Sequence, residues 1–179
     1  MKHNVYVISA GRYNKLPFNK NQKSEYIFCV KKGEGKLYEE NGCINVKETG
    51  NLMDSRNFAL EHAFQCNKIC VQVSDDIKKV VVNKNFGEPK KVDLDFAIKD
   101  IVLKFNKVKG VKLLGIPPTD NSFFANKILS VNTFCIGDML FIKPSDIRFD
   151  TQLTLKEDYD FTLQHKQRGD VIRYQKYLF

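Results

Sequence analysis

Two groups of acidic residues in this sequence are placed where they could act on phosphates or hydroxyls. Asp75 and Asp76 directly follow the apolar run 69–73, and Glu157 and Asp158 stand side by side late in the chain. Carboxylates at the carboxyl end of a buried strand lie at the edge where α/β proteins bind their ligands. Their oxygens suit a hard divalent cation, which can in turn hold phosphates. From residues 67–82 alone, a solvated turn at Asp75 and Asp76 is the simpler interpretation.

Two arginines and one histidine add to these acids. Arg12 follows the apolar run 5–9, and its guanidinium matches phosphate oxygens in geometry. Arg56 lies in the first turn of an expected helix, against the dipole's preference for acids there, so a diphosphate or a local salt bridge would explain it. His165 is seven residues, or two helical turns, after Asp158, so both share one helical face. These groups together suit transfer of a group from a metal-bound nucleotide diphosphate.

The elements that must position these residues alternate between strands and helices. Runs of β-branched residues predict strands, and apolar residues at helical spacing predict helices. The expected strands are 5–9, 26–30, 44–46, 69–73, 113–116, 128–136, 139–142 and 171–174, and the expected helices are 33–41, 51–64, 92–108 and 156–168. Gly137 and Asp138 are typical of a hairpin turn. We therefore expect one α/β domain spanning residues 1–179, in which residues 44–73 form a strand-helix-strand unit.

Composition limits the classes of protein to consider. With 179 residues, 42% hydrophobic and 28% charged, the chain is typical of a globular domain. It has no apolar run of membrane-spanning length and no secretory signal, and its five scattered cysteines indicate reduced thiols, so we expect a cytoplasmic protein. The net charge of +8 fits either a solvated lysine-rich surface or a polyanionic partner. Lysines 99, 104, 107 and 109 lie outside the apolar stripe of the expected helix 92–108, so they form a solvated face or, as the second interpretation, a polyanion-binding face. Phe123 and Phe124 are either core anchors or the wall of a pocket.

Four segments together resemble a known family. The order VYVISAGR, GNLMDSRNFALEHA, ICVQVSDDI and KEDYDFTLQH is similar to GT-A glycosyltransferases. More closely, it resembles the compact TET/JBP-associated glycosyltransferases of phages and of kinetoplastid base-J synthesis. The resemblance covers residues 4–176, and the acidic helix with its histidine is the most specific part. It implies a Rossmann-like nucleotide-diphospho-sugar transferase fold, with a mixed sheet flanked by helices.

The resemblance also implies an activity and a set of site residues. The activity is metal-dependent transfer of a sugar from a UDP-sugar to a hydroxymethylated pyrimidine in DNA, in the host cytoplasm if the protein is phage-encoded. A base stacked in a duplex would have to flip out to reach such a site. Position 74 is Ser where the family pattern has Asp. The implied roles are metal binding (Mn²⁺ or Mg²⁺) by Asp76 and His165, catalytic base for Asp158 with Glu157 as the alternative, and donor binding by Ser9, Gly11, Arg12, Arg56, Asn57 and Asp75.

Other functions remain open at this point. Within enzymes, the alternatives are a glycosyltransferase acting on protein or glycan, and a nucleotidyltransferase, which also pairs strand-end carboxylates with divalent metals. From another class, a catalytically silent nucleic-acid-binding protein could have kept the fold. Such a binder needs neither metal nor nucleotide sugar, and it loses affinity steeply with salt.

Overall fold

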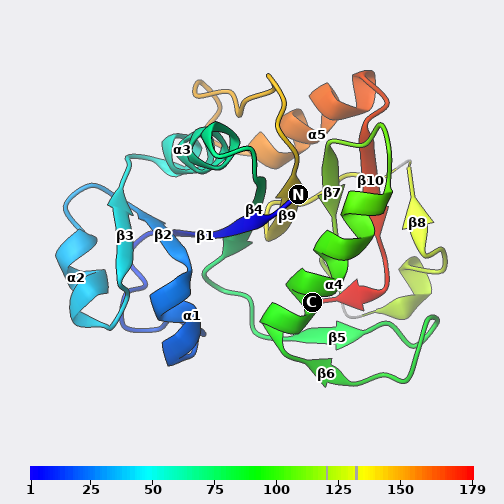
Figure 1. The fold of residues 1–179 in the computed structure, drawn as a ribbon, viewed down its shortest axis with the longest axis horizontal. Coiled ribbons are helices and arrows are strands. Elements are labelled where there is room, and N and C mark those ends of the chain that lie inside the picture. Colours follow the sequence, from blue (N-terminus) through cyan, green and yellow to red (C-terminus); the bar gives the residue numbers. More distant parts are fainter. Residues whose placement is uncertain (120, 132) are drawn as a thin grey trace.

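A large mixed sheet flanked by helices forms the frame of the protein (Figure 1). The computed structural model describes residues 1–119, 121–131 and 133–179. Within them, eight strands form the sheet in the order β3-β2-β1-β4-β9-β7-β10-β8. The strands are β1 (His3–Ser9), β2 (Ile27–Val30), β3 (Asn45–Glu48), β4 (Ile69–Ser74), β7 (Leu113–Gly115), β8 (Leu129–Ser130), β9 (Met139–Ile142) and β10 (Val171–Tyr174). This architecture confirms the expected α/β class and is compatible with a Rossmann-like fold.

Strand direction decides which loops meet at which edge. Strands β1 to β4 are mutually parallel, and β9 runs antiparallel to both of its neighbours, β4 and β7. Strand β10 is parallel to β7, and therefore also to β4. The carboxyl ends of β1, β2, β3 and β4 consequently share one edge of the sheet with the amino end of β9.

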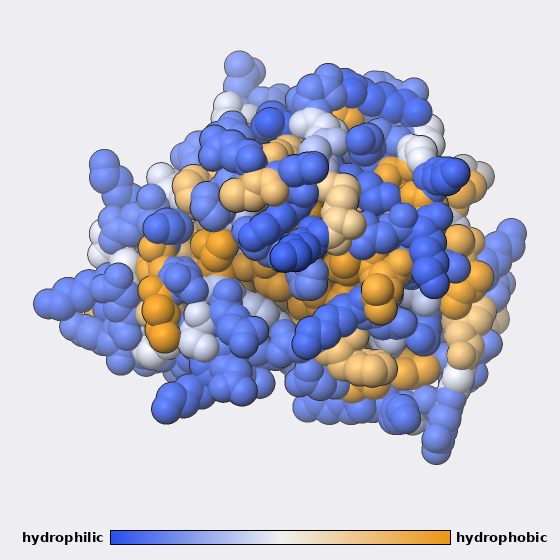
Figure 2. Space-filling model, viewed as in Figure 1, coloured by the Kyte–Doolittle hydropathy of each residue, from blue (hydrophilic) through white to orange (hydrophobic). Residues whose placement is uncertain are grey.

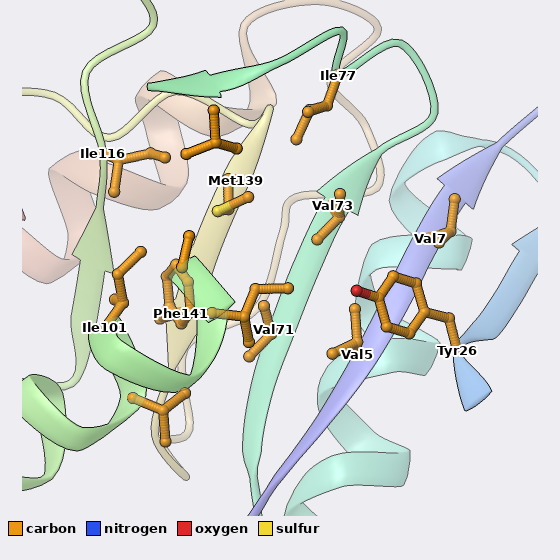
Figure 3. Close-up of a cluster of buried hydrophobic side chains, with 14 of the residues drawn as sticks. Val5, Val7, Tyr26, Val71, Val73, Ile77, Ile101, Ile116, Met139 and Phe141 are labelled. Carbon is orange, nitrogen blue, oxygen red and sulfur yellow. The ribbon is translucent and has the colours of Figure 1, made fainter. Parts of the chain in front are cut away.

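The helices cover both faces of this sheet. They are α1 (Lys20–Glu25), α2 (Gly35–Glu40), α3 (Leu52–Gln65), α4 (Leu94–Lys107) and α5 (Glu157–Gln167). On one face, Ile98, Ile101 and Phe105 of α4 pack with the valines of β1 and β4. Figure 3 shows this core, with Ile101 facing Phe141 of β9. On the other face, α3 and α5 bury Leu60 and Phe161 against the sheet.

Local sequence explains where the helices begin. The Asn51 side chain accepts a hydrogen bond from the Asp54 amide, and Asp54 reciprocates, which is a capping box at the start of α3. The Asp93 side chain caps α4 in a similar way. The same kind of box, between Asn19 and Gln22, begins α1, a helix that the apolar periodicity did not predict.

A second, smaller sheet lies beside the carboxyl-terminal part of the chain. It contains β11 (Tyr177–Leu178), β5 (Val80–Val82) and β6 (Lys91–Val92), in that order. Strand β5 follows the Asp75–Asp76 turn, so this sheet extends away from the carboxyl edge of β4 (Figure 1).

The prediction of a hairpin around Gly137 and Asp138 is wrong. Strand β9 pairs with β4 and β7, while β8 pairs with β10, so the two segments are not partners. The predicted strand 128–136 is reduced to Leu129–Ser130 among the described residues, and Asn132 lies outside them. Gly137 and Asp138 instead lie beside the carboxyl end of β4, directly before β9 begins.

Among the described residues, no helix is long and apolar enough to cross a membrane. Figure 2 shows charged and polar residues around the outside of one face and apolar residues across its middle. All five cysteines are free, which fits the expected reduced thiols.

Candidate functional site

A cavity of about 520 Å³ opens at the carboxyl edge of the parallel strands. This volume is in the range of small-molecule sites, and the place is where α/β sheets bind ligands. Its walls come from the ends of β1, β2 and β4 and from the first turn of α3. The polar residues among them are Ser9, Arg12, Lys31, Lys32, Asn51, Ser55, Arg56, Ser74 and Asp75. Of the predicted donor-binding residues, the cavity therefore brings together Ser9, Arg12, Arg56 and Asp75.

A chain of hydrogen bonds fixes the floor of this cavity. The Ser9 hydroxyl donates to Asp75 Oδ2 and lies 2.6 Å from the Tyr38 hydroxyl. Because the Ser9 proton is directed to Asp75, Tyr38 is the donor in its contact with Ser9. Burial raises the pKa of Asp75, while Ser9 and Arg12 oppose that rise. Asp75 is thus a positioned carboxylate, held by Ser9 in the turn that follows β4.

Arg12 lines the cavity, and Asp76, which is not among the lining residues, lies beside Arg12. Arg12 Nε is 3.7 Å from Asp75, and Arg12 Nη2 is 3.7 Å from Asp76 Oδ2. Both Arg12 and Asp76 are about half exposed, so water screens their attraction and they can exchange partners. Ser74 Oγ donates to Asp76 Oδ1 over 2.6 Å. Asp76 is therefore an accessible carboxylate, whereas Asp75 is an internal one.

Asp138 joins the acids, although the sequence pattern indicated only a turn there. Its carbonyl accepts from the Ser74 amide over 2.8 Å, which holds it beside the end of β4. The Gly137 amide donates to Asp158 Oδ2 over 2.9 Å, which brings α5 to the same place. Burial raises the pKa of Asp138. The negative charges of Asp76 and Asp158 raise it further, and the positive charge of Arg56 opposes the rise. Three carboxylates therefore converge at the end of β4.

Arg56 is mostly enclosed rather than presented to the cavity. It is 6% exposed, and its Nε lies 3.3 Å from Glu157 Oε1, an ion pair whose angle falls short of a hydrogen bond. Its other nitrogens donate to Gln72 Oε1 and to the Gly137 carbonyl. Burial lowers the pKa of Arg56, and Glu157 is the main opposing influence. These contacts join α3, β4, the start of β9 and α5.

Asn57 and Gly11 have structural roles in this arrangement. The Asn57 amide donates to the Phe149 carbonyl and accepts from the Phe149 amide, each over 2.9 Å, so it fixes the loop before α5. Gly11 has φ +68° in an exposed turn, and its amide donates to Glu34 Oε2 over 2.8 Å. Neither residue lines the cavity.

The structure does not bring His165 to Asp76. His165 is fully buried, and its Nδ1 lies 2.7 Å from Asp170 Oδ1. Asp170 precedes β10, which is parallel to β4, so this pair lies toward the amino edge of the sheet, opposite Asp76. Phe161 packs edge-on against the ring. The prediction that His165 lies on the same helix as Asp158 is confirmed. Two helical turns separate the two residues, however, so His165 lies away from the acids at the end of β4.

The carboxylates could hold a divalent cation only if phosphates and water completed its coordination. Within residues 1–119, 121–131 and 133–179, no group of three or more His, Cys, Asp or Glu side chains is arranged to hold an ion. A protein cage is therefore not built here. Mg²⁺, however, is commonly held by one or two carboxylates with substrate phosphates and water. The half-exposed Asp76, whose charge is felt by Asp138, fits that mode.

Two cations and one acid at this edge were missed in the sequence. Lys31 and Lys32 follow β2 as Arg12 follows β1, so the same strand-end rule would have found them. Asp138 precedes the apolar run of β9, and only the pairing of β9 with β4 reveals its neighbours. No protein-family model matches this chain, and no curated protein is significantly similar to it.

Proposed function

We propose that this protein is a glycosyltransferase that moves a sugar from a nucleotide-sugar donor to a hydroxyl acceptor. The observation that carries the proposal is one cavity with cations on its wall, Asp75 in its lining and Asp76 beside its Arg12. Such a site can hold a diphosphate and place the reacting carbon beside a base. The similarity to GT-A glycosyltransferases supports the same reading and favours a UDP-sugar.

Arg12, Lys31 and Lys32 would bind the diphosphate. All three are exposed at the cavity, so their charges are free to approach phosphate oxygens. Charge-assisted bonds of this kind are stronger than neutral ones, and arginine matches phosphate with two parallel donors. Arg12 would exchange its loose contacts with Asp75 and Asp76 for the phosphates. Arg56 would support the wall without binding the donor directly.

Asp76 would hold the divalent metal ion, Mg²⁺ or Mn²⁺, together with the donor's phosphates. When bound, the ion neutralises negative charge that develops on the leaving diphosphate. Asp138 lies close enough for Asp76 to raise its pKa, so it is the second carboxylate available at this place. Asp75, held by Ser9, keeps the turn that presents Asp76.

Asp158 would act as the general base. Its carboxylate accepts from the Gly137 and Tyr159 amides, which fix its direction and leave other lone pairs open. Asp158 takes the proton of the acceptor hydroxyl, and the hydroxyl oxygen attacks the anomeric carbon. The bond between that carbon and the diphosphate oxygen breaks, and the diphosphate leaves with the electron pair. Glu157 is paired with the buried Arg56, so it is the weaker choice for this role.

The acceptor that the family resemblance implies is a hydroxymethylated pyrimidine in DNA. The net charge of +8 is compatible with a polyanionic acceptor. A base inside a duplex would have to leave the stack to place its hydroxymethyl oxygen beside Asp158.

A thermal-shift panel of nucleotide sugars, with and without Mn²⁺, tests the donor site first. A ligand that binds only the folded state raises its apparent stability, so one nucleotide sugar should raise Tm in a metal-dependent way. Transfer to hydroxymethylated DNA is then measured with that donor. No shift with any nucleotide or metal would favour a non-catalytic nucleic-acid-binding protein instead.

Matched variants separate the roles of the acids. Asp76→Asn should abolish the metal-dependent shift, whereas Asp158→Asn should keep the shift and reduce turnover about 10²–10⁴-fold, the usual contribution of a general base. Asp160→Asn is the control, because it makes the same change in the same helix and its bond to Gln164 can persist. Full turnover in both site variants would refute the assignment.

A further inference from the structure

A basic surface lies on the small sheet, outside the cavity described above. Lys84, Lys90 and Lys91 belong to the connection between β5 and β6 and to the start of β6, and all three are exposed. They line a second cavity, of about 370 Å³, together with Asn121 and Ser122. Its described lining contains no acid. This surface therefore attracts negative charge.

Two exposed aromatic rings border the lysines. Phe123 and Phe124 form the 3₁₀ turn η1 (Ser122–Phe124), directly after the residues that line the second cavity. They are 78% and 67% exposed, so they are not the core anchors that were one of the two interpretations of the sequence. Figure 1 places this turn, drawn in yellow-green, beside the far end of the β5–β6 hairpin. The two rings meet edge to face, with centroids 5.3 Å apart, and their remaining exposed surface is open to a flat partner.

The turn that carries these rings is held firmly. Asn121 caps it by accepting from the Phe123 amide over 3.0 Å. Asn85 donates to the Ser122 carbonyl, and Asn83 donates to the Ala125 carbonyl, each over 2.8 Å. Asn83 is fully buried, and it also donates to the Gln175 carbonyl. The hairpin loop and the aromatic turn are thus one supported unit, so the rings are displayed on a fixed base.

The basic surface continues to the acids of the site. A small cavity of about 270 Å³ is lined by Asp76, Asp138, Lys79 and Phe179. Lys79 also lines the second cavity, as does Leu178, the neighbour of Phe179. A chain molecule bound along the lysines would therefore reach the small cavity that Asp76 and Asp138 line.

We infer that Lys84, Lys90, Lys91, Phe123 and Phe124 form a docking surface for a single-stranded polynucleotide segment. The lysines would neutralise its phosphates, and the phenylalanines would stack on its unpaired bases. Proteins that bind single strands combine a positive groove with aromatic platforms in this way. The inference extends the nucleic-acid acceptor of the proposed function, but binding to this surface requires neither metal nor donor.

Fluorescence anisotropy with a labelled 12-nucleotide single strand tests the inference without donor or metal. Replacing the three lysines by alanine should weaken binding and reduce the slope of log affinity against log salt by about 2, because each phosphate contact contributes about 0.7 for single strands. Phe123→Ala or Phe124→Ala should weaken binding about tenfold each and leave that slope unchanged, because stacking carries no charge.

The control variant replaces Lys99, Lys107 and Lys109 by alanine. It removes the same charge from α4 and the segment directly after it, which leads to the amino end of β7 at the opposite edge of the sheet. Binding should change little in this variant. A 12-base-pair duplex should bind without any loss on Phe123→Ala, because its bases are not free to stack.

Three results would overturn the inference. They are absence of binding to the single strand, an α4 control as weak as the hairpin variant, and phenylalanine variants that bind as tightly as the unaltered protein. None of these results bears on the donor site, because the thermal shift with nucleotide sugars is measured separately. A positive anisotropy result with no donor shift would likewise support the surface and refute the enzyme.

Discussion

Replacing Arg56 by methionine should destabilise the protein strongly even when no ligand is present. The side chain is 6% exposed and faces Glu157, which is 8% exposed, so its loss leaves a buried carboxylate without its counter-charge. Removing one partner of a buried pair costs about 3–5 kcal/mol. At about 2–4 °C per kcal/mol for a chain of this size, Tm should fall by about 6–20 °C. A residue that only bound donor phosphates would show almost none of this loss.

A double-mutant cycle gives the decisive measurement. Arg56→Met, Glu157→Gln and the double variant are unfolded in urea, and the double variant should recover part of the loss, since a neutral amide replaces the stranded charge. Arg148→Met is the matched control: Arg148 lies 3.8 Å from Glu61, but both are substantially exposed, so the loss of that pair should cost at most about 1 kcal/mol. A Tm change below about 2 °C for Arg56→Met would refute the structural role and make Arg56 available to the donor.

Three further predictions concern stability. Gly137→Ala should cost about 1–3 kcal/mol, because a new Cβ would collide with the Arg56 guanidinium, and thermal unfolding should show a smaller penalty when Arg56→Ala is also present. Burial lowers the pKa of His165 below 6.5, so the unfolded chain binds more protons at this residue than the folded chain does. The free energy of unfolding should therefore fall as the pH drops through 6.5. Urea titration at each pH should show a smaller fall in His165→Gln. Asn57→Asp should cost about 1–3 kcal/mol by chemical denaturation, because it keeps the acceptor for the Phe149 amide but opposes a carboxylate to the Phe149 carbonyl; Asn57→Ala, which loses both bonds, is the comparison.

Local signals in the sequence predicted the parts of the fold that local physics determines. Alternating apolar residues located β1 and β4, and helical spacing located α3 and α4. The carboxyl-edge rule then placed Arg12 and Asp75 at one cavity, as the structure has them. These features depend on residues that are close in the chain.

Features that depend on distant pairing were not predictable in this way. Asp138 gained its neighbours only because β9 inserts antiparallel beside β4. His165 was placed on the correct helix, but its partner Asp170 sits after a reversal of the chain, at Gly169 with φ +70°. Phe123 and Phe124 follow a proline-rich loop, and nothing in their own pattern distinguishes an exposed turn from a buried one.

The late arrival of β9 has a consequence for how the chain is made. Every described residue that lines the main cavity falls between positions 8 and 75, so all of them have been synthesised long before β9 is. Until Met139–Ile142 emerge and pair with Cys70–Val73, strand β4 has an open, largely apolar edge in the middle of the future sheet. Unprotected edges of this kind pair with other chains. Fragments that stop before β9 should therefore aggregate during expression, although they contain every described residue that lines the cavity.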